Sequence, residues 1–308
     1  MANCFFCYKD AGEVLYHPTC CKKFFGTTEL PELEINPENL RSIAIQNISS
    51  RVAITGAQPK FSASLEKVQN QNRLTIVGLW GEYILKPPHP DFEWMVETED
   101  LTMHLASLFK IQVCGHTVIP DSKGQLVYLA KRFDRLGKEK IHVEDLCQLS
   151  EFLTENKYKG SYEKAGKLVK KFCNTTLDVI NYFELVVFSF LSGNNDMHLK
   201  NFSLVHSDSG PYLSPAYDLL NINLVFPQDK EEMALTMNAK KNRLKRLDFE
   251  VLGKALELPE KVVSNIFKKY TSLNPQVFDW IDRSFLGEEQ KDEYKKIWLS
   301  KQKIFINS

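Results

Sequence analysis

The segment that decides the fold is Gly193-Asn194-Asn195-Asp196-Met197-His198-Leu199-Lys200-Asn201. It follows the apolar run Tyr182–Leu191, which has the length and composition of a buried helix. The segment itself is rich in Asn and other polar residues, so we expect it to leave that helix as a loop. Within it, Asp196 and Asn201 have the spacing D-x-x-x-x-N, which places a carboxylate and an amide on one short loop.

A hairpin is predicted directly after this loop. Two short β-prone runs, Phe202–Val205 and Pro211–Leu213, flank the turn-forming sequence Ser207-Asp208-Ser209-Gly210. The hairpin leads to a second acidic residue, Asp218, in the sequence Ala216-Tyr217-Asp218-Leu219-Leu220. The chain therefore delivers an acid, an amide and a second acid in a fixed order.

This order suits phosphoryl transfer. That reaction needs a carboxylate to orient the attacking hydroxyl, ligands for Mg²⁺ and a cation over the nucleotide phosphates. Asp196, Asn201 and Asp218 provide the first two in the order found in a protein-kinase catalytic centre. Asp and Asn at this spacing are also common in turns and helix caps, so it is the combination with the hairpin and the second Asp that favours catalysis.

The rest of the chain divides into a β-rich part and a helical part. Strands are expected at 51–54, 60–65, 74–79, 82–85, 112–119 and 126–132, with a short helix at 37–47 and a longer one at 97–109. After Asp134, helices are expected at 143–154, 161–173, 176–192, 248–256, 259–271, 274–284 and 288–305. The predicted fold class is α+β, a two-lobed protein-kinase-like fold. Its parts are a small Cys/His module (1–28), a β-rich N-lobe (29–133) and a helical C-lobe (134–308).

The catalytic segment resembles that of the HipA-like toxin kinases, in which a similar sequence is followed by an equivalent of Tyr217-Asp218. The similarity extends to three further segments: Thr55-Gly56-Ala57-Gln58-Pro59-Lys60, Ile84-Leu85-Lys86-Pro87 and Lys131-Arg132-Phe133-Asp134-Arg135. It covers the chain from about Arg51 to the C-terminus. The family's additional N-terminal subdomain has no counterpart before this core, so the chain looks like the short HipT type.

The resemblance implies a non-specific serine/threonine protein kinase that uses ATP and Mg²⁺. Asp196 would be the base, Asn201 and Asp218 the magnesium ligands, and Lys86 the cation on the phosphates. The residues implied in nucleotide binding are Gly56, Ala57, Gln58, Lys60, Lys86, Lys131, Phe133, Asn201 and Asp218, with residues 131–133 as the hinge under adenine. Glu99 is expected either to pair with Lys86 or to serve as a first-turn acid of its helix. His198 and Lys200 would either contact phosphate or structure the loop.

The family also carries a regulatory autophosphorylation serine, or two, just before the phosphate-loop glycine. Those two positions are Ala53 and Thr55 here, and Ala53 is either native or an engineered substitution. Thr55 is therefore the predicted autophosphorylation site, with Ser50 as a less well placed alternative. A phosphate there would add about −1.5 to −2 charge beside the nucleotide phosphates and could expel the loop.

The family's targets imply a protein substrate, an aminoacyl-tRNA synthetase, whose phosphorylation inhibits translation. The implied partners are a DNA-binding HipB-like antitoxin and a small HipS-like antitoxin. Two rival functions stay open: a catalytically silent nucleotide-binding regulator in an antitoxin complex, and a small-molecule kinase. The catalytic residues do not distinguish a protein hydroxyl from a metabolite hydroxyl.

A cluster of soft ligands lies near the N-terminus. Cys4-x-x-Cys7 and His17-x-x-Cys20 are two pairs suited to a tetrahedral structural Zn²⁺, and Cys21 could replace Cys20. The alternative is a reduced set of packed thiols without a metal. The seven cysteines of the chain do not have the spacing of a secreted disulfide framework, which favours a reducing compartment and a cytoplasmic protein.

The charge balance excludes some partners. Lys plus Arg and Asp plus Glu number 39 each, so the chain lacks the positive excess of a general nucleic-acid or membrane-surface binder. We therefore expect no membrane and no direct nucleic-acid partner. A basic run such as 240–246 could touch tRNA or DNA, although such runs are more often a solvated loop or helix face.

Overall fold

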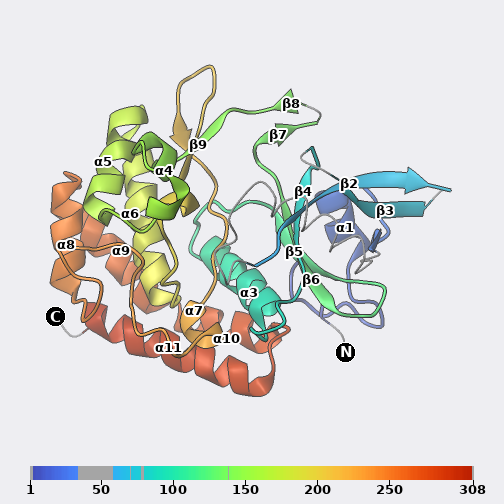
Figure 1. Cartoon of the computed structure of the whole chain (residues 1–308). Coiled ribbons are helices and arrows are strands. Elements are labelled where there is room, and N and C mark those ends of the chain that lie inside the picture. The colour runs from blue at the N-terminus through green and yellow to red at the C-terminus, as the bar shows by residue number, and fades with distance from the viewer. Residues whose placement is uncertain (1–2, 34–57, 70, 78–79, 138, 307–308) are drawn as a thin grey trace. The chain divides into compact units, whose positions relative to one another are not determined.

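The structure is a computed structural model that describes residues 3–33, 58–69, 71–77, 80–137 and 139–306. The chain forms two compact units (Figure 1). The sheet unit consists of Met1–Asp100 and Gly115–Arg132, and the helical unit of Leu101–Cys114 and Phe133–Ser308. Residues 1–28, expected as a separate module, fall in the sheet unit. The strand expected at 51–54 and the helix expected at 37–47 lie outside the described residues.

The sheet unit is built on one six-stranded sheet with the strand order β1-β3-β2-β4-β6-β5. The strands are β1 (Glu32–Leu33), β2 (Phe61–Val68), β3 (Gln71–Val77), β4 (Tyr83–Lys86), β5 (His116–Pro120) and β6 (Leu126–Lys131). Neighbouring strands are antiparallel except β1 and β3, which are parallel. The strands predicted within the described residues are confirmed, with ends that shift by a few residues.

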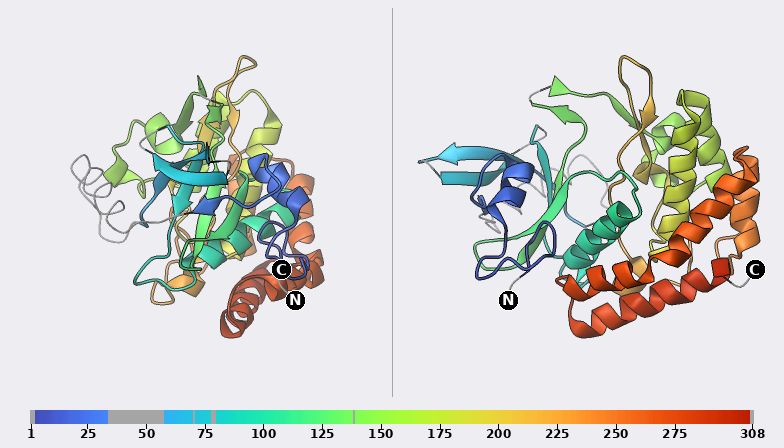
Figure 2. Two further views of the ribbon diagram at one scale, coloured as in Figure 1. Left: turned by 90° about the vertical axis from the view of Figure 1, so that its right-hand side faces the viewer. Right: turned by 180° about the vertical axis from the view of Figure 1, so that it is seen from behind.

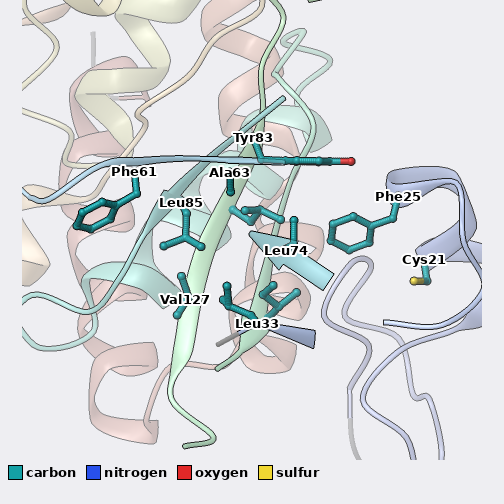
Figure 3. Close-up of a cluster of buried hydrophobic side chains, with 11 residues drawn as sticks. Cys21, Phe25, Leu33, Phe61, Ala63, Leu74, Tyr83, Leu85 and Val127 are labelled. Carbon is teal, nitrogen blue, oxygen red and sulfur yellow. The ribbon is translucent and has the colours of Figure 1, made fainter. Parts of the chain in front are cut away.

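One face of this sheet is covered by the short helix α1 (Pro18–Phe25). Cys21 and Phe25 of α1 lie in one buried cluster with Leu74 and Tyr83 of the sheet (Figure 3). The ring centroids of Phe25 and Tyr83 are 5.6 Å apart. A helix of this length is unstable alone in water. Its stability therefore comes from burying these side chains, at about 1.5–3 kcal/mol for each large one.

The helical unit follows the sequence pattern closely. Its long helices are α5 (Tyr162–Phe172), α6 (Thr176–Leu191), α8 (Arg246–Ala255), α9 (Glu260–Ser272), α10 (Asn274–Arg283) and α11 (Glu288–Ile306), and α7 (Ile222–Val225) is one short turn. Figure 2 shows α8 and α9, in orange, and α11, in red, beside the yellow α6, and α6 contacts α5, α8 and α11. Because α6 is buried along most of its length, it is the central support of the unit. Among the described helices, none is both long and apolar enough to cross a bilayer.

The helix expected at 143–154 is wrong. That stretch forms strand β9 (Val143–Asp145), the four-residue helix α4 (Leu146–Leu149) and the 3-10 turn η1 (Thr154–Asn156). β9 pairs with β10 (Ser203–Val205), which also pairs with β11 (Tyr212–Leu213). The predicted hairpin at 202–213 is thus confirmed and gains a third strand. Pairing with a strand distant in the sequence overrides the local helical pattern.

Short strands complete the unit. β7 (Arg135–Leu136) and β8 (Glu139–Lys140) form a separate antiparallel pair. The turn between them includes Gly137, which has a φ of +59°. An added Cβ at Gly137 would meet no atom within 4 Å.

The turn that ends α6 requires glycine. Gly193 has a φ of +74°, in the left-handed region that side chains disfavour. An added Cβ at Gly193 would lie 2.4 Å from Oδ1 of Asn221, a fully buried residue. This glycine lets the chain leave α6 sharply and begin the loop that contains Asp196.

Gly193→Ala is expected to destabilise the helical unit more than Gly137→Ala, although both positions have positive φ. Left-handed geometry costs about 1–2 kcal/mol at either position. At Gly193 the clash with Asn221 adds roughly 1–3 kcal/mol. Urea unfolding followed by circular dichroism measures both variants, and equal losses would contradict the close approach at Gly193.

Candidate active site

The predicted nucleotide cation, Lys86, is the last residue of β4, and its side chain is only about 5% exposed. Its Nζ lies 2.5 Å from Oε1 of Glu99, which belongs to α3 (Met95–Leu108), so the predicted ion pair is confirmed. Across the sheet, Lys86 is the register partner of Tyr128 in β6, and the ammonium lies 5.2 Å from that ring. A buried ammonium without a counter-charge is costly. Glu99 therefore keeps Lys86 charged and fixes its position.

Three further candidates for nucleotide binding are described. Gln58 is buried, and its Nε2 donates to the carbonyl oxygen of Pro87 at 3.1 Å, next to Lys86. Lys60 and Lys131 are exposed, the first just before β2 and the second at the end of β6. Thr55, Gly56 and Ala57 lie outside the described residues, as do Ala53 and Ser50.

The predicted hinge, residues 131–133, includes the division between the two compact units, which falls between Arg132 and Phe133. Phe133 is half-buried in the helical unit, and its ring centroid lies 5.5 Å from that of Tyr217. Phe133 thus contacts the residue that directly precedes Asp218.

The candidate catalytic loop, residues 193–201, is held by hydrogen bonds from its backbone groups to residues of α5 and α6. The amide of Asn194 donates to the carbonyl of Ser189 in α6 at 2.8 Å. The hydroxyl of Tyr162 in α5 donates to the carbonyl of Met197, a fully buried residue, at 2.9 Å. Buried polar groups must be paired, so these contacts are what allows a polar loop to lie in the interior.

The candidate base is Asp196, whose Oδ1 accepts a hydrogen bond of 2.7 Å from the hydroxyl of Tyr158. Partial burial, followed by the charge of Asp196, raises the pKa of the Tyr158 phenol. The phenol therefore keeps its proton and remains a donor to the carboxylate. The ring of Tyr158 also packs edge-on against His198, with 5.0 Å between centroids.

Asn201, the candidate metal ligand of the same loop, is tied to the base. Its Nδ2 donates to the backbone carbonyl of Asp196 at 3.2 Å. Its amide N–H donates to the carbonyl of His198 at 3.0 Å, which closes the short turn η2 (Leu199–Asn201). Because the side-chain nitrogen is a donor to Asp196, the oxygen of Asn201 is the atom suited to a cation.

Lys200 forms an ion pair outside the loop. Its Nζ lies 2.6 Å from Oδ2 of Asp145, which also caps α4. This contact supports the loop-structuring alternative for Lys200, and a role in phosphate contact stays a prediction for both Lys200 and His198. His198 is buried beside Tyr158.

Tyr217 joins the segment of the second acid to the catalytic loop. Its hydroxyl donates to the carbonyl of Lys200 at 2.8 Å and accepts from the hydroxyl of Ser203 at 2.7 Å. Burial raises the pKa of this phenol, so it stays a donor. Asp218 follows with a φ of +60°, a strained geometry that tends to occur at functional sites. Lys200, the neighbour of Asn201, and Tyr217, the neighbour of Asp218, are therefore in direct contact.

Two residues of this site were missed by sequence reasoning. Tyr158 lies between helices without a spacing signal, and Asp145 was assigned to a helix. Both reach the catalytic loop only through the tertiary fold, at separations of 38 and 55 residues. No local pattern could have identified them.

The predicted zinc ligands Cys4, Cys7, His17 and Cys20 come together in the sheet unit, with their ligand atoms all within 4.8 Å of one another. Cys21, the alternative to Cys20, is instead part of the buried apolar cluster in Figure 3.

Comparison with known proteins identifies the family. Residues 52–277 match the model of the HipA-like C-terminal domain. The chain belongs to this family. The serine/threonine-protein kinase toxin HipA of Shewanella oneidensis is 23% identical over 245 residues, which are 68% of this chain and 54% of that protein. A protein of Sinorhizobium fredii named "Putative kinase Y4dM" is 33% identical over 229 residues, 69% of this chain and 56% of its own length.

Solved structures show the same fold. A chain of the Shewanella oneidensis complex of HipA, HipB and operator DNA matches with a TM-score of 0.69 at 19% identity, over 89% of this chain and 72% of that chain. The Helicobacter pylori proinflammatory kinase CtkA matches with a TM-score of 0.55 at 14% identity, over 79% of this chain and 94% of that chain. The predicted fold class, α+β and kinase-like, is confirmed. This HipA-like chain spans about half the length of the curated relatives it matches.

Glu99→Gln is expected to destabilise the sheet unit by about 3–5 kcal/mol, because it leaves the Lys86 ammonium buried without a counter-charge. Glu32→Gln is the matched control in the same unit, since Glu32 forms an exposed pair with Arg73 at 3.7 Å. Such an exposed pair contributes less than about 1 kcal/mol. Chemical unfolding measures both changes, and a loss for Glu99→Gln no larger than the control's would show that the buried pair does not stabilise the fold.

Proposed function

We propose that this chain is an ATP-dependent serine/threonine protein kinase, with Asp196 as its base. The observation that carries the proposal is the loop in which Asn201 hydrogen-bonds the backbone of Asp196, while Tyr217 ties Lys200 to the segment of Asp218. The kinase names of its relatives point in the same direction.

In the proposed reaction, Asp196 accepts a hydrogen bond from the acceptor hydroxyl and takes its proton. The hydroxyl oxygen forms a bond to the γ-phosphorus of ATP, the bond from that phosphorus to the bridging oxygen breaks, and ADP leaves. Tyr158 holds the carboxylate of Asp196 in a fixed orientation for this contact. Lys86, kept charged by Glu99, is the proposed cation for the nucleotide phosphates.

The donor set of Asn201 and Asp218 fits Mg²⁺, which prefers oxygen ligands and usually takes only one or two from the protein. The Asn201 oxygen is suited to this role because its nitrogen is used by the Asp196 carbonyl. When bound, Mg²⁺ would neutralise charge on the phosphates. Gly56, Ala57, Gln58, Lys60, Lys131 and Phe133 complete the proposed nucleotide-binding set.

The proposed acceptor is a protein, with an aminoacyl-tRNA synthetase as the target that the family resemblance implies, so that phosphorylation would inhibit translation. A HipB-like antitoxin is a proposed partner, since the similar solved structure is a complex of the toxin HipA with HipB and operator DNA. A small HipS-like antitoxin is the second proposed partner, which the family resemblance alone implies. Thr55 is the proposed autophosphorylation site, where a phosphate would repel the nucleotide phosphates.

Asp196→Asn is expected to reduce phosphate transfer from radiolabelled ATP to proteins of a cell lysate by roughly 10²–10⁴-fold, the contribution typical of a positioned base. Asp208→Asn, in the exposed turn of the hairpin, is the matched control and should retain activity. Mass spectrometry of the same reactions identifies the target residue and tests Thr55, which should carry phosphate only with the active protein.

Three outcomes of this assay separate the alternatives. If a protein is labelled by the wild type and this label is lost with Asp196→Asn, the protein-kinase proposal is supported. Label only in small metabolites would replace the protein substrate with a small-molecule acceptor. ATP binding without any transfer would favour the silent regulator.

Tyr158→Phe is expected to lower kcat by about tenfold or more while leaving the KM for ATP nearly unchanged. It removes one hydrogen bond to a charged group, worth about 1.5–3 kcal/mol, and leaves the ring in place against His198. Steady-state kinetics provides the measurement, with Tyr212→Phe on the exposed end of the hairpin as control. A variant with unaltered kcat would show that the phenol does not orient Asp196.

A further inference from the structure

The Cys/His cluster of the sheet unit has the arrangement of a metal site rather than of packed thiols. Nδ1 of His17 lies 3.4 Å from Sγ of Cys7 and 3.8 Å from Sγ of Cys20. In a tetrahedral zinc site with bonds of about 2.3 Å to sulfur and 2.0–2.1 Å to nitrogen, ligand atoms lie about 3.5–3.8 Å apart. The observed separations match those edges.

The histidine is oriented to present a lone pair to this cluster. Nε2 of His17 lies 3.0 Å from the backbone carbonyl of Asp10. A carbonyl oxygen only accepts, so Nε2 carries the proton and Nδ1, on the side of the cysteines, does not. Metal-bound histidines typically fix their tautomer through such a hydrogen bond from the other ring nitrogen.

The backbone around the cysteines is shaped for the same purpose. The amide of His17 points at Sγ of Cys4 at 3.4 Å, a contact suited to a thiolate acceptor. Tyr8, directly after Cys7, has a φ of +56°, which is unfavourable for a bulky residue. The amide of Tyr8 donates to the carbonyl of Cys4 at 2.9 Å, so Cys4 and Cys7 lie within one tight turn that spans residues 4–8. Strained turns of this kind persist where a ligand clamp holds them.

We propose that Cys4, Cys7, His17 and Cys20 bind one structural Zn²⁺, and that this ion fixes the position of the ion pair between Lys86 and Glu99. Three soft thiolates and one imidazole in a closed tetrahedron form a structural rather than a catalytic zinc site.

The proposed zinc module, residues 3–26, contacts both elements that supply this ion pair. The hydroxyl of Tyr8 donates to Oδ2 of Asp100 in α3 at 2.7 Å, one residue after Glu99. The other oxygen of Asp100 lies 2.6 Å from Nδ1 of His116 in β5. Tyr8, Asp100 and His116 are all buried, so this chain of contacts is shielded from water.

Two more contacts tie the module to the sheet. The hydroxyl of Thr117 in β5 donates to the carbonyl of Phe5 at 3.2 Å. The ring of Phe24 lies 5.9 Å from that of Tyr83, the first residue of the strand that ends at Lys86. A fixed turn at Cys4 and Cys7 thus holds Tyr8 against α3, and α1 against β4.

The metal is tested first, with a readout independent of phosphate transfer. Full-length protein purified without chelators or immobilised nickel should contain one zinc per chain by elemental analysis. Replacement by Co²⁺ should give the visible absorption of a tetrahedral thiolate site. Cys7→Ser and His17→Ala should each lose the metal, whereas Cys173→Ser, in the helical unit, should retain it.

A second group requires its own control, because His142, Glu144 and His206 also lie within 4.8 Å of one another. The double variant His142→Ala, His206→Ala should keep its zinc. Zinc retained by Cys7→Ser but lost by this double variant would move the site and overturn the proposal. If the ligand variants do not fold, thiol modification of the wild-type protein is the test, and it should release the zinc. Wild-type protein that contains no zinc would overturn the proposal.

The positioning effect is measured by amide hydrogen exchange of the wild type with and without zinc. Removal should speed exchange in Met95–Asp100 by roughly tenfold or more, the loss expected for a hydrogen bond to a charged group. Tyr8→Phe should keep its zinc and reproduce part of this change, whereas Tyr212→Phe should not. Unchanged exchange in this part of α3, or equal acceleration across β5 and β6, would overturn the positioning of the ion pair by zinc. Neither result depends on the proposed kinase activity.

Discussion

A buried ammonium group needs a carboxylate beside it, and the pair of Lys86 and Glu99 meets this need in the sheet unit. The pair links the end of β4 to the first part of α3, so neither element can shift without exposing a charge to an apolar interior. The surrounding contacts serve the same end. Tyr128 covers the ammonium from β6, and Asp100, next to Glu99, is itself paired with His116. These contacts of the sheet unit therefore fix the position of the Lys86 ammonium.

In the helical unit the corresponding constraint is hydrogen-bond satisfaction. The loop after α6 is polar and largely buried, so each of its backbone groups needs a partner. Ser189 of α6, Tyr162 of α5 and Tyr217 provide partners from three directions. The glycine at 193 provides the sharp turn that brings the loop among them. A loop held in this way gives Asp196 a fixed position without any contribution from substrate.

Much of this arrangement was accessible from the sequence. Apolar periodicity predicted α6 and the long helices after it, and the D-x-x-x-x-N spacing pointed to the candidate catalytic loop. The contact of Lys86 with Glu99 was one of two roles that the sequence left open for Glu99, and the structure shows the pair. Other features depend on partners distant in the chain. Residues 143–145 have a helical pattern but pair as a strand with β10, and Tyr158 reaches Asp196 only because α5 packs on α6.

The same long-range contacts bear on the order in which the protein folds. The ion pair of Lys200 with Asp145 spans 55 residues, and all of α5 and α6 lies between its partners. Bringing residues of such separation together costs loop-closure entropy, so we expect this ion pair to form after the more local contacts. During synthesis the N-terminal part emerges first, so a nascent chain contains Lys86 and Asp196 before the strand β11 and Tyr217 exist. We expect a partly folded chain to carry most residues of the centre without their geometry, which confines any activity of this loop to the finished protein.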